Sequence, residues 1–521
     1  MKKGISVKKV IVHKDTYYDS VFLMQVTAQL KGRAGIDEVQ VTMATPQNKT
    51  LLHGLGFTEG IDDAGANDLL IAISGDEKVF DGLQADIKEM LVATKSGAEG
   101  ESFKPSSING ALKVLPEANM AIISVAGEYA ANEARKALNA GLHVMLFSDN
   151  VSLEDEVELK TLAGEKGLLV MGPDCGTAII NGSPLCFANE VRQGAVGVVA
   201  ASGTGAQEVS VLIDRFGGGC SQVIGTGGRD LKEGVGGKTM LQGIEALKKD
   251  EATKVILVVS KPPAKEVAGK VIDALEKCGK PAVVHFIGSK AKADEGQVYM
   301  ASSLEGAALA SLAAIAGEPA TEKTFTLSDD EVAALINQEV SGKKDEQKYV
   351  RGYFTGGTLC DEALFVLKED LENVRCNIHP DKSLCLADPF KSEGHTLVDL
   401  GDDTFTQGRP HPMIEPATRV ERMEAEADDS EIAVVLLDVV LGHGSHEDPA
   451  GAIVPVIKKA KENAKNKGGN LTVLASIVGT ERDFQGFASQ RAKLEEVGVV
   501  IMPSNAQMAK LAAKIMKEMG V

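Results

Sequence analysis

Two glycine-rich segments, far apart in the chain, share a design that can bind anions. Residues 196–205 read Val-Gly-Val-Val-Ala-Ala-Ser-Gly-Thr-Gly, and residues 433–444 read Ala-Val-Val-Leu-Leu-Asp-Val-Val-Leu-Gly-His-Gly. In each, an apolar strand runs into a glycine turn that opens a helix. Glycine lets a ligand approach the backbone, and the first N–H groups of a helix are unpaired. We therefore expect the two helix starts to face each other and hold a phosphate or carboxylate with the residues Ser202, Gly203, Thr204, Gly205, Gly442 and Gly444.

Titratable and cationic side chains accompany these turns. His443 lies inside the second turn, where it would place a titratable group beside the bound anion. Arg409 and His411 lie in the stiff segment Gly408-Arg-Pro-His-Pro412, whose prolines fix their presentation. We take His443, Arg409 and His411 as the catalytic candidates. A solvated loop histidine and a purely structural turn remain the alternatives.

A third group of residues is a candidate for substrate binding. It comprises Gly227, Gly228 and Arg229, where the arginine fork suits a carboxylate or phosphate, and Gly172 with Cys175 in another turn. Cys175 reads more readily as a packed thiol than as a nucleophile, because no base is identifiable nearby. Asp399, Asp402 and Asp403 are of the type that holds Mg²⁺, but carboxylates in a loop are usually solvated, so no metal is expected.

The composition excludes several classes of function. The chain has 521 residues, 44% hydrophobic and 25% charged, with a formal net charge of −19 that would repel nucleic acid and anionic membranes. Its seven cysteines show no C-x-x-C spacing and read as reduced thiols. No apolar run approaches the roughly 18 residues of a membrane span. We expect a cytoplasmic protein that acts on a small anionic substrate, without nucleic-acid or membrane partners.

The elements that must position these residues alternate between strand and helix. Residues 1–95 predict a small α+β module of the split-βαβ kind, and residues 96–107 a linker. From residue 113 onward, uniformly apolar strands alternate with helices, which indicates parallel sheets covered on both faces. A polar stretch at 317–349 marks a boundary. The fold class is therefore α/β, with several doubly wound parallel-sheet domains after residue 113 and the small α+β module before them.

Several motifs resemble those of succinyl-CoA synthetase. Met171-Gly-Pro-Asp-Cys-Gly is similar to the Gly-Pro-Asn-Cys-Pro-Gly segment of its α subunit, and Ala201-Ser-Gly-Thr matches that subunit's helix start. Ile224-Gly-Thr-Gly-Gly-Arg-Asp resembles a glycine loop of the same subunit. Val398-Asp-Leu-Gly-Asp-Asp and the strand ending at Gly442 resemble the C-terminal domain of the β subunit. The whole chain, including Gly408-Arg-Pro-His-Pro-Met, looks like an FdrA-type, acyl-CoA synthetase-like protein.

This resemblance implies stacked domains: a Rossmann-like CoA-binding-type domain at 113–190, an α-subunit flavodoxin-like domain at 191–318 and a β-subunit flavodoxin-like domain at 345–521. The chain departs from the ligases in three places. The interval 317–349 is too short for an ATP-grasp domain, residues 297–306 lack the phosphorylated histidine, and the glycine-rich CoA turn is missing. Phosphate is therefore the expected ligand, no cofactor is certain, and CoA stays an open alternative.

The FdrA-type family is linked to anaerobic allantoin breakdown. The resemblance implies a subunit of an oxamate carbamoyltransferase, which converts oxalurate and phosphate into oxamate and carbamoyl phosphate without a nucleotide. It also implies other enzyme subunits and an oligomer. Two alternatives stay open: an ADP-forming acyl-CoA synthetase component that acts with a separate ATP-grasp subunit, and a non-catalytic regulatory or scaffold subunit.

Overall fold

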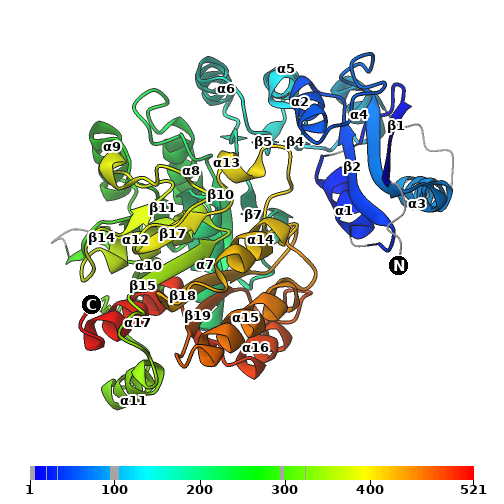
Figure 1. The fold of residues 1–521 in the computed structure, drawn as a ribbon. Coiled ribbons are helices and arrows are strands. Elements are labelled where there is room, and N and C mark those ends of the chain that lie inside the picture. The colour runs from blue at the N-terminus through cyan, green and yellow to red at the C-terminus, as the bar shows by residue number, and fades with distance from the viewer. Residues whose placement is uncertain (1–5, 19, 32, 94–104, 294–297, 323) are drawn as a thin grey trace.

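A computed structural model describes residues 6–18, 20–31, 33–93, 105–293, 298–322 and 324–521. Four sheets follow one another along the chain (Figure 1). Of the predicted linker, residues 96–107, the part up to residue 104 lies outside the described residues. Among the helices of the described ranges, none is both long enough and apolar enough to cross a membrane.

The N-terminal module is a three-stranded sheet with helices. Strand β3 lies between β1 and β2 and runs antiparallel to both, so the β1-α1-β2 unit is split by a third strand, as the sequence predicts. The elements are β1 (Ser6–His13), α1 (Ser20–Leu30), β2 (Ile36–Met43), α2 (Pro46–Gly54), β3 (Leu69–Asp76), η1 (Glu77–Val79) and α3 (Phe80–Ala93).

A small parallel sheet follows, in the order β4-β5-β6. Helices α5 and α6 pack against each other and bury alanines and leucines such as Ala134 and Leu159. The elements are α4 (Ile108–Val114), β4 (Met120–Ile123), α5 (Gly127–Asn139), β5 (His143–Leu146), α6 (Leu153–Lys166) and β6 (Val170–Met171).

The third sheet has eight strands in the order β13-β14-β12-β11-β9-β10-β7-β8. The β7–β8 hairpin turns at Asn181-Gly182, both with positive φ, and pairs into this sheet although it precedes residue 191. The strands are β7 (Thr177–Ile180), β8 (Ser183–Cys186), β9 (Gln193–Ala201), β10 (Cys220–Gly225), β11 (Val255–Ser260), β12 (Ala282–Phe286), β13 (Lys292–Ala293) and β14 (Val298–Met300). The helices are α7 (Gly203–Arg215), α8 (Lys238–Lys249), α9 (Lys265–Glu276) and α10 (Leu304–Ala316).

The fourth sheet has six strands, all parallel, in the order β16-β17-β15-β18-β19-β20. The strands are β15 (Tyr349–Phe354), β16 (Arg375–Cys376), β17 (Thr396–Asp399), β18 (Ile432–Val440), β19 (Thr472–Val478) and β20 (Val500–Met502). The helices are α11 (Asp329–Val340), α12 (Gly357–Leu367), η2 (Lys382–Leu384), α13 (Asp403–Thr406), α14 (Ala417–Glu426), α15 (Pro449–Asn466), α16 (Phe487–Glu496) and α17 (Asn505–Glu518). The α/β class predicted from the sequence is confirmed.

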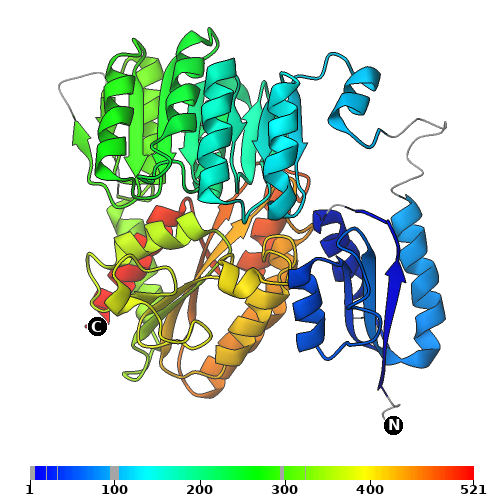
Figure 2. The same ribbon diagram turned by 90° about the horizontal axis from the view of Figure 1, so that it is seen from above.

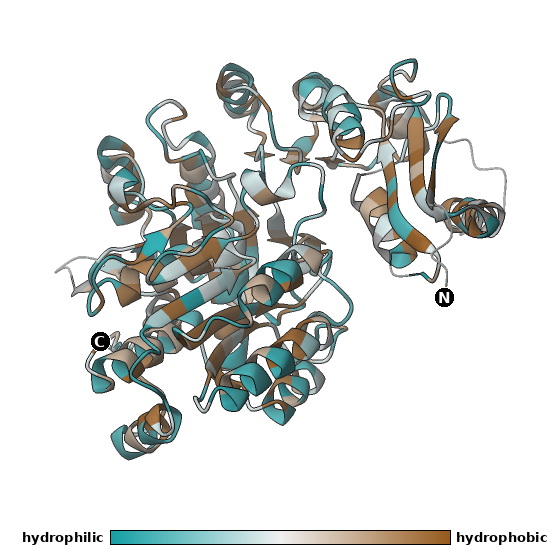
Figure 3. Cartoon of the chain, viewed as in Figure 1, coloured by the Kyte–Doolittle hydropathy of each residue, from teal (hydrophilic) through white to brown (hydrophobic). Residues whose placement is uncertain are grey.

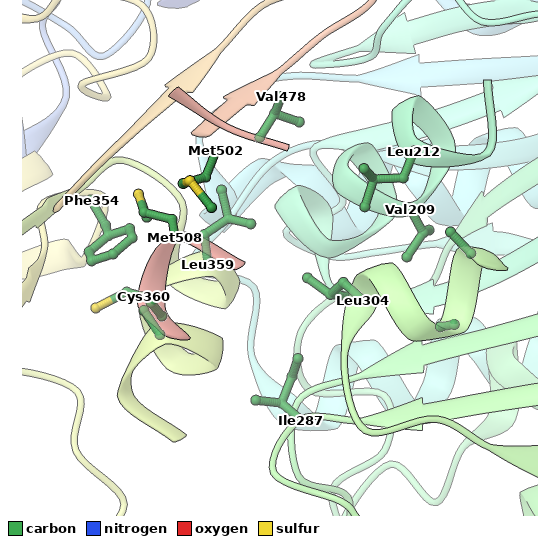
Figure 4. Packing of buried hydrophobic residues seen from close by; sticks show 14 of the residues in the cluster. Val209, Leu212, Ile287, Leu304, Phe354, Leu359, Cys360, Val478, Met502 and Met508 are labelled. Atoms are coloured by element: carbon green, nitrogen blue, oxygen red, sulfur yellow. The ribbon is translucent and has the colours of Figure 1, made fainter. Parts of the chain in front are cut away.

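The two large sheets pack against each other through four helices, α7, α10, α12 and α17 (Figures 1 and 2). One hydrophobic cluster joins them, with Leu212 from α7, Leu304 from α10, Leu359 from α12 and Met508 from α17, all fully buried (Figure 4). Helices α8 and α9 cover the outer face of the eight-stranded sheet, and α14 to α16 that of the six-stranded sheet. Figure 3 shows apolar strands and mostly polar outward faces on the outer helices. Burial of each side chain in the cluster that joins α7, α10, α12 and α17 stabilises the folded state by roughly 1.5–3 kcal/mol. The two large sheets therefore form a permanent interface.

Buried carboxylates also tie this interface together. Glu208 of α7 accepts the Asn505 backbone N–H at 3.2 Å, and Glu362 of α12 accepts the Leu304 N–H at 2.8 Å. Each carboxylate thus meets the positive end of a helix from another element. Burial, and after it the charge of nearby Glu362, nevertheless raise the pKa of Glu208 to about 8.

Candidate functional site

The helix start that meets Ser202 belongs to α12. The Ser202 hydroxyl caps α7 by accepting the Gly205 N–H at 3.0 Å, and it lies 2.6 Å from the Thr358 hydroxyl. The backbones approach equally closely, because a β-carbon at Gly356 would lie 2.8 Å from Thr204 Cγ2. Two helices from the two large sheets therefore begin at the same place.

Their first-turn amides are available for a ligand. The N–H groups of Gly203, Thr204, Gly357 and Thr358 have no acceptor within their own helices, because the first turn of a helix lacks them. All four residues line one cavity of about 1130 Å³. Two helix dipoles with their positive ends at this cavity favour a bound anion.

A buried carboxylate fixes the start of α12. Asp438 in β18 is fully buried, and its carboxylate accepts the backbone N–H of Thr355 at 2.9 Å and of Gly356 at 2.7 Å. Arg419 of α14, also buried, pairs with it at 3.0 Å. Burial raises the pKa of Asp438, while Arg419 opposes that shift. Asp438 thus positions the glycine turn and accepts hydrogen bonds from the two backbone amides that precede α12, those of Thr355 and Gly356.

One cation lies at the α12 start. Lys261 follows β11 and pairs with Asp361 at 3.0 Å between Nζ and Oδ2. A β-carbon at Gly357 would lie 3.3 Å from the Lys261 Nζ, so the ammonium group borders the first turn of α12. Burial opposes the charge on Lys261, but Asp361 and Asp399 outweigh it and raise its pKa. Lys261 is therefore a permanent positive charge on the cavity wall.

A carboxyl group and an imidazole complete this wall. Asp399 ends β17 with only 6% of its surface exposed, and burial raises its pKa to about 7 despite Lys261 nearby. Its Oδ1 accepts the Gly401 N–H at 2.9 Å. Desolvation lowers the pKa of His411 to about 4, and its Nδ1 accepts the Met413 N–H at 3.2 Å. The imidazole is thus neutral at pH 7, and the remaining proton belongs on Nε2.

The Gly227-Gly228-Arg229 turn, a candidate for substrate binding, also lines the cavity. Arg229 lines the cavity while its guanidinium donates to the Val151 carbonyl at 2.8 Å and pairs with Glu156 at 2.9 Å. Asp174 faces the same space. Desolvation, with Asp149 and Asp403, raises the pKa of Asp174 to about 6. The cavity has more acidic than basic residues, so its attraction for anions is local to the helix starts, Lys261 and the arginines.

The N-terminal module closes one side of the cavity. Thr45, Gln47 and Asn48 of this module are among the lining residues. The Tyr17 hydroxyl donates to the Ser124 carbonyl at 3.1 Å, and Gly408 approaches Leu51 so closely that a β-carbon there would lie 2.5 Å from it. Figure 2 shows the module, in blue, beside the six-stranded domain. The segment that carries Arg409 and His411 is therefore held between the module and the cavity.

The second predicted helix start is not part of this site. Gly442 donates its N–H to the Gln485 side chain at 3.0 Å, Gly444 packs behind Phe187, and neither lines the cavity. His443 is half-exposed outside the cavity and pairs with Glu190 at 2.7 Å. Helix α15 begins only at Pro449 and is capped by Asp448. The prediction that Gly442 faces Ser202 is wrong, because the turn after β18 is used to pack against the segment around residue 188.

The other predicted residues divide between the wall and the layer behind it. Ser202, Gly203, Thr204, Gly227, Gly228, Arg229, Arg409 and His411 line the cavity. Gly205 lies behind Ser202, and Gly172 packs on the Leu146 carbonyl, so neither reaches the cavity. Cys175 touches the cavity but is almost fully buried, which raises its pKa to about 12. It is a packed thiol. Arg409 also pairs with Glu421 at 2.6 Å.

Sequence reasoning missed the residues at the α12 start. Residues 349–358 read Tyr-Val-Arg-Gly-Tyr-Phe-Thr-Gly-Gly-Thr, an apolar strand followed by a glycine turn with the same Gly-Thr pair as the Ser202 segment. That similarity was the available signal. Lys261 gives no signal of its own, because it is one lysine among many and acquires its place from the end of β11.

Three families match parts of the chain. A family described as CoA-ligase matches residues 353–515, and one described as CoA binding domain matches residues 191–288. A family described as AllF, heavy metal-associated domain, matches residues 4–106.

Two relatives and one solved structure illustrate the range of similarity. The chain is 45% identical over 507 residues to the uncharacterized protein YahF of Escherichia coli K12, covering 97% of this chain and 98% of YahF. It is 27% identical over 197 residues to succinate–CoA ligase [ADP-forming] subunit alpha 1 of Archaeoglobus fulgidus, covering 36% of this chain and 65% of the relative. The structure of ATP citrate lyase from Methanothrix soehngenii with citrate and coenzyme A aligns at 13% identity and a TM-score of 0.34, over 80% of this chain and 84% of that one.

The heavy-metal description of the N-terminal family does not fit this module. Residues 4–106 contain no cysteine, and their only histidines are His13 and His53. His53 is paired with Asp62 at 3.0 Å. Within the described ranges, no group of three histidine, cysteine or acidic residues is arranged to hold a metal ion. The module lacks the thiolates that soft metals need.

Proposed function

The chain belongs to the family of the E. coli protein YahF, an FdrA-type family with succinyl-CoA synthetase-like domains, and on that premise we propose that it is a subunit of an oxamate carbamoyltransferase. It acts in the cytoplasm with other enzyme subunits and converts oxalurate and phosphate into oxamate and carbamoyl phosphate. The observation that carries this proposal is the convergence of two helix starts, from α7 and α12, on one cavity beside Lys261.

Phosphate binds between the two helix starts. The first-turn amides of Gly203, Thr204, Gly357 and Thr358 donate to its oxygens, and Lys261 balances part of its charge. Held there, phosphate has lost much of its freedom before it meets the carbamoyl carbon, and this ordering is a large part of the catalysis of such a displacement.

The remaining wall orients the second substrate. Arg229 and Arg409 bind the carboxylate of oxalurate, for which a guanidinium fork is suited. The neutral His411 donates its Nε2 proton to the carbonyl oxygen under attack and so stabilises the developing oxyanion. The reaction needs no nucleotide. Between the two large sheets, residues 324–348 hold one helix, α11, and supply no nucleotide-binding domain.

A second candidate is an ADP-forming acyl-CoA synthetase component that acts with a separate ATP-grasp subunit. The matches to the CoA-ligase and CoA-binding families favour it. In that case the clamped anion is an acyl phosphate, and CoA occupies the broad part of the cavity.

A thermal-shift series separates these functions, because a ligand that binds only the native state raises the melting temperature. The purified chain is heated with phosphate, carbamoyl phosphate, oxalurate, CoA or ATP. Protection by phosphate, carbamoyl phosphate and oxalurate supports the transferase, and protection by CoA supports the synthetase. No protection by any of them contradicts both and leaves a scaffold subunit.

A substitution in the clamp tests the site itself. In Gly203→Val the new methyl groups project into the cavity, because the nearest atom to a β-carbon there is Thr177 Oγ1 at 3.5 Å. We expect the affinity for phosphate, measured from its thermal protection of the protein, to fall by at least tenfold while the fold persists. Gly269→Val, on the exposed side of α9 with open space around it, is the matched control. Equal phosphate protection in both variants would refute this assignment of the α7 start.

A further inference from the structure

Asp399 is the buried ionisable group that most directly faces the clamp. Its Oδ2 lies 2.4 Å from the position of a β-carbon at Gly357, the first residue of α12, and it has no hydrogen-bond partner among the described residues. Its backbone is fixed by Asn377, which accepts the Asp399 N–H at 2.9 Å and donates to the Asp399 carbonyl at 3.0 Å. One oxygen of a rigid, buried carboxyl group is therefore aimed at the ligand space.

Two neighbouring groups would complete a reaction centre there. A β-carbon at Gly401 would lie 2.5 Å from His411 Nε2 and 3.2 Å from Asp399 Oδ1, so both atoms border the same small space. Lys261 Nζ borders the same region as Asp399 Oδ2, 3.3 Å from the β-carbon position at Gly357. Residues 357 and 401 can only be glycine here, because a β-carbon would collide with Asp399 or His411. The carboxyl, imidazole and ammonium groups of Asp399, His411 and Lys261 all line the same cavity.

Resting on the proposed function, we infer that Asp399 is the proton carrier of the transfer. Ionised Asp399 accepts the proton of hydrogenphosphate as the phosphate oxygen forms a bond to the carbamoyl carbon of oxalurate. The bond from that carbon to the bridging nitrogen breaks, and its electron pair goes to the nitrogen of oxamate. Asp399 then gives its proton to this nitrogen, so the carboxylate is regenerated and the reaction needs no other reactant.

The charged surroundings suit a group that gains and loses a proton near neutrality. Desolvation is the main cause that raises the pKa of Asp399 to about 7; Asp361 and Asp402 act in the same direction, and Lys261 and the Gly401 N–H oppose them. His411 is neutral, and the Cys360 thiol behind Asp399 has its own pKa raised well above the ordinary range by burial. A general acid–base group works best with a pKa near the working pH.

The first test measures binding without turnover. Sulfate is a tetrahedral dianion whose charge does not change between pH 6 and 8, so it reports the state of the protein. Ionised Asp399 repels an anion at the α12 start, so we expect sulfate affinity of the wild type to fall about tenfold as pH rises across 7. In the Asp399→Asn variant, we expect this fall in sulfate affinity across pH 7 to disappear. Calorimetric titration with sulfate, against chloride at equal ionic strength, makes the comparison.

The second test measures transfer in the complex that co-purifies with the chain from its native cells. Asp399→Asn should keep phosphate protection but lose at least a hundredfold of oxalurate phosphorolysis, measured as carbamoyl phosphate formed. Asp381→Asn is the matched control, because Asp381 is an exposed helix cap outside the cavity. Asp399→Asn turning over like the wild type, or an unchanged sulfate profile, overturns the role of Asp399 alone. A wild-type complex that neither binds phosphate nor turns over overturns the proposed function first.

Discussion

Single glycine residues decide how closely a ligand can approach the two helix starts. Gly203 has open space beyond it, with Thr177 Oγ1 at 3.5 Å from a β-carbon position. Gly357 is crowded, since the same position there lies 2.4 Å from Asp399 Oδ2 and 3.3 Å from Lys261 Nζ. The same added methyl group would therefore have different effects at two residues that share one role.

Gly357→Ala should weaken phosphate binding more than Gly203→Ala does. The methyl group at residue 357 displaces Asp399 or Lys261 and occupies the ligand space, so we expect at least tenfold loss of affinity. At residue 203 the methyl group makes only an ordinary contact, and the loss should be a few-fold. Phosphate titration followed by thermal shift measures both, with Gly269→Ala as the control. A larger loss at residue 203 would show that α12 does not form half of the clamp.

At the scale of single residues, the sequence identifies candidate site residues where they lie close together within one short segment. The Ser-Gly-Thr turn, the Gly-Gly-Arg turn and the stiff segment around His411 were predicted as site residues and line the cavity. Asp399 could only be named as one of three loop carboxylates. Its pKa is raised by burial at the end of β17, and Lys261, which follows β11, opposes that shift. No spacing within the sequence reveals that the two residues meet.

At the scale of elements, α7, α10, α12 and α17 form an interface that includes ionisable side chains. Glu208, Glu305 and Glu362 are all buried between these helices, and burial raises the pKa of each. For Glu208 the folded pKa of about 8 lies above the ordinary value of 4.5. The unfolded chain therefore loses this proton at lower pH, and stability falls as pH rises from about 4.5 to 8.

Glu208→Gln should stabilise the protein at alkaline pH. The amide oxygen can still accept the Asn505 N–H, and no buried charge forms. Above pH 8 we expect a free energy of unfolding higher than that of the wild type by about 1–3 kcal/mol, with little difference near pH 4. Urea unfolding at pH 4, 7 and 9 measures this, with Glu276→Gln on exposed α9 as control. A variant that is less stable than the wild type at pH 9 would contradict the assignment.

The order of elements was predictable because their periodicities are strong. The sequence predicts strands at 7–12, 350–354 and 471–477 and helices at 153–166 and 304–316, and these agree with the structure to within a residue or two. The pairing of helix starts was not predictable from this order. Two strands of the same sheet, β15 and β18, both end in glycine turns, and only the stacking of the two large sheets selects β15.

At the scale of the whole molecule, the N-terminal module is part of the cavity wall and lacks metal ligands. Its first 106 residues have no cysteine, so a soft metal would find only His13 and His53, one of which is already paired. If the module lines the substrate cavity, the melting temperature of the protein should respond to the substrate. If the module carries a metal, the melting temperature should respond to that metal.

Addition of Zn²⁺ or Cu⁺ at equimolar concentration should leave the melting temperature unchanged, and so should EDTA. A bound structural metal would instead raise stability strongly, because its binding energy adds to the folding energy. Thermal melting with and without each metal provides the measurement. The His13→Ala variant serves as a check if any shift is seen. A stabilisation by metal that disappears in His13→Ala would show that the N-terminal module binds a metal after all.

The joining of both helix starts in one polypeptide has a consequence for how the clamp responds to dilution. In a two-subunit arrangement, half of such a clamp departs whenever the subunits dissociate. Here α7 and α12 are covalently connected through about 140 residues of chain, so each meets the other at a high effective concentration that does not depend on how much protein is present. The grip on phosphate should thus stay constant across protein concentrations at which separate subunits would have come apart.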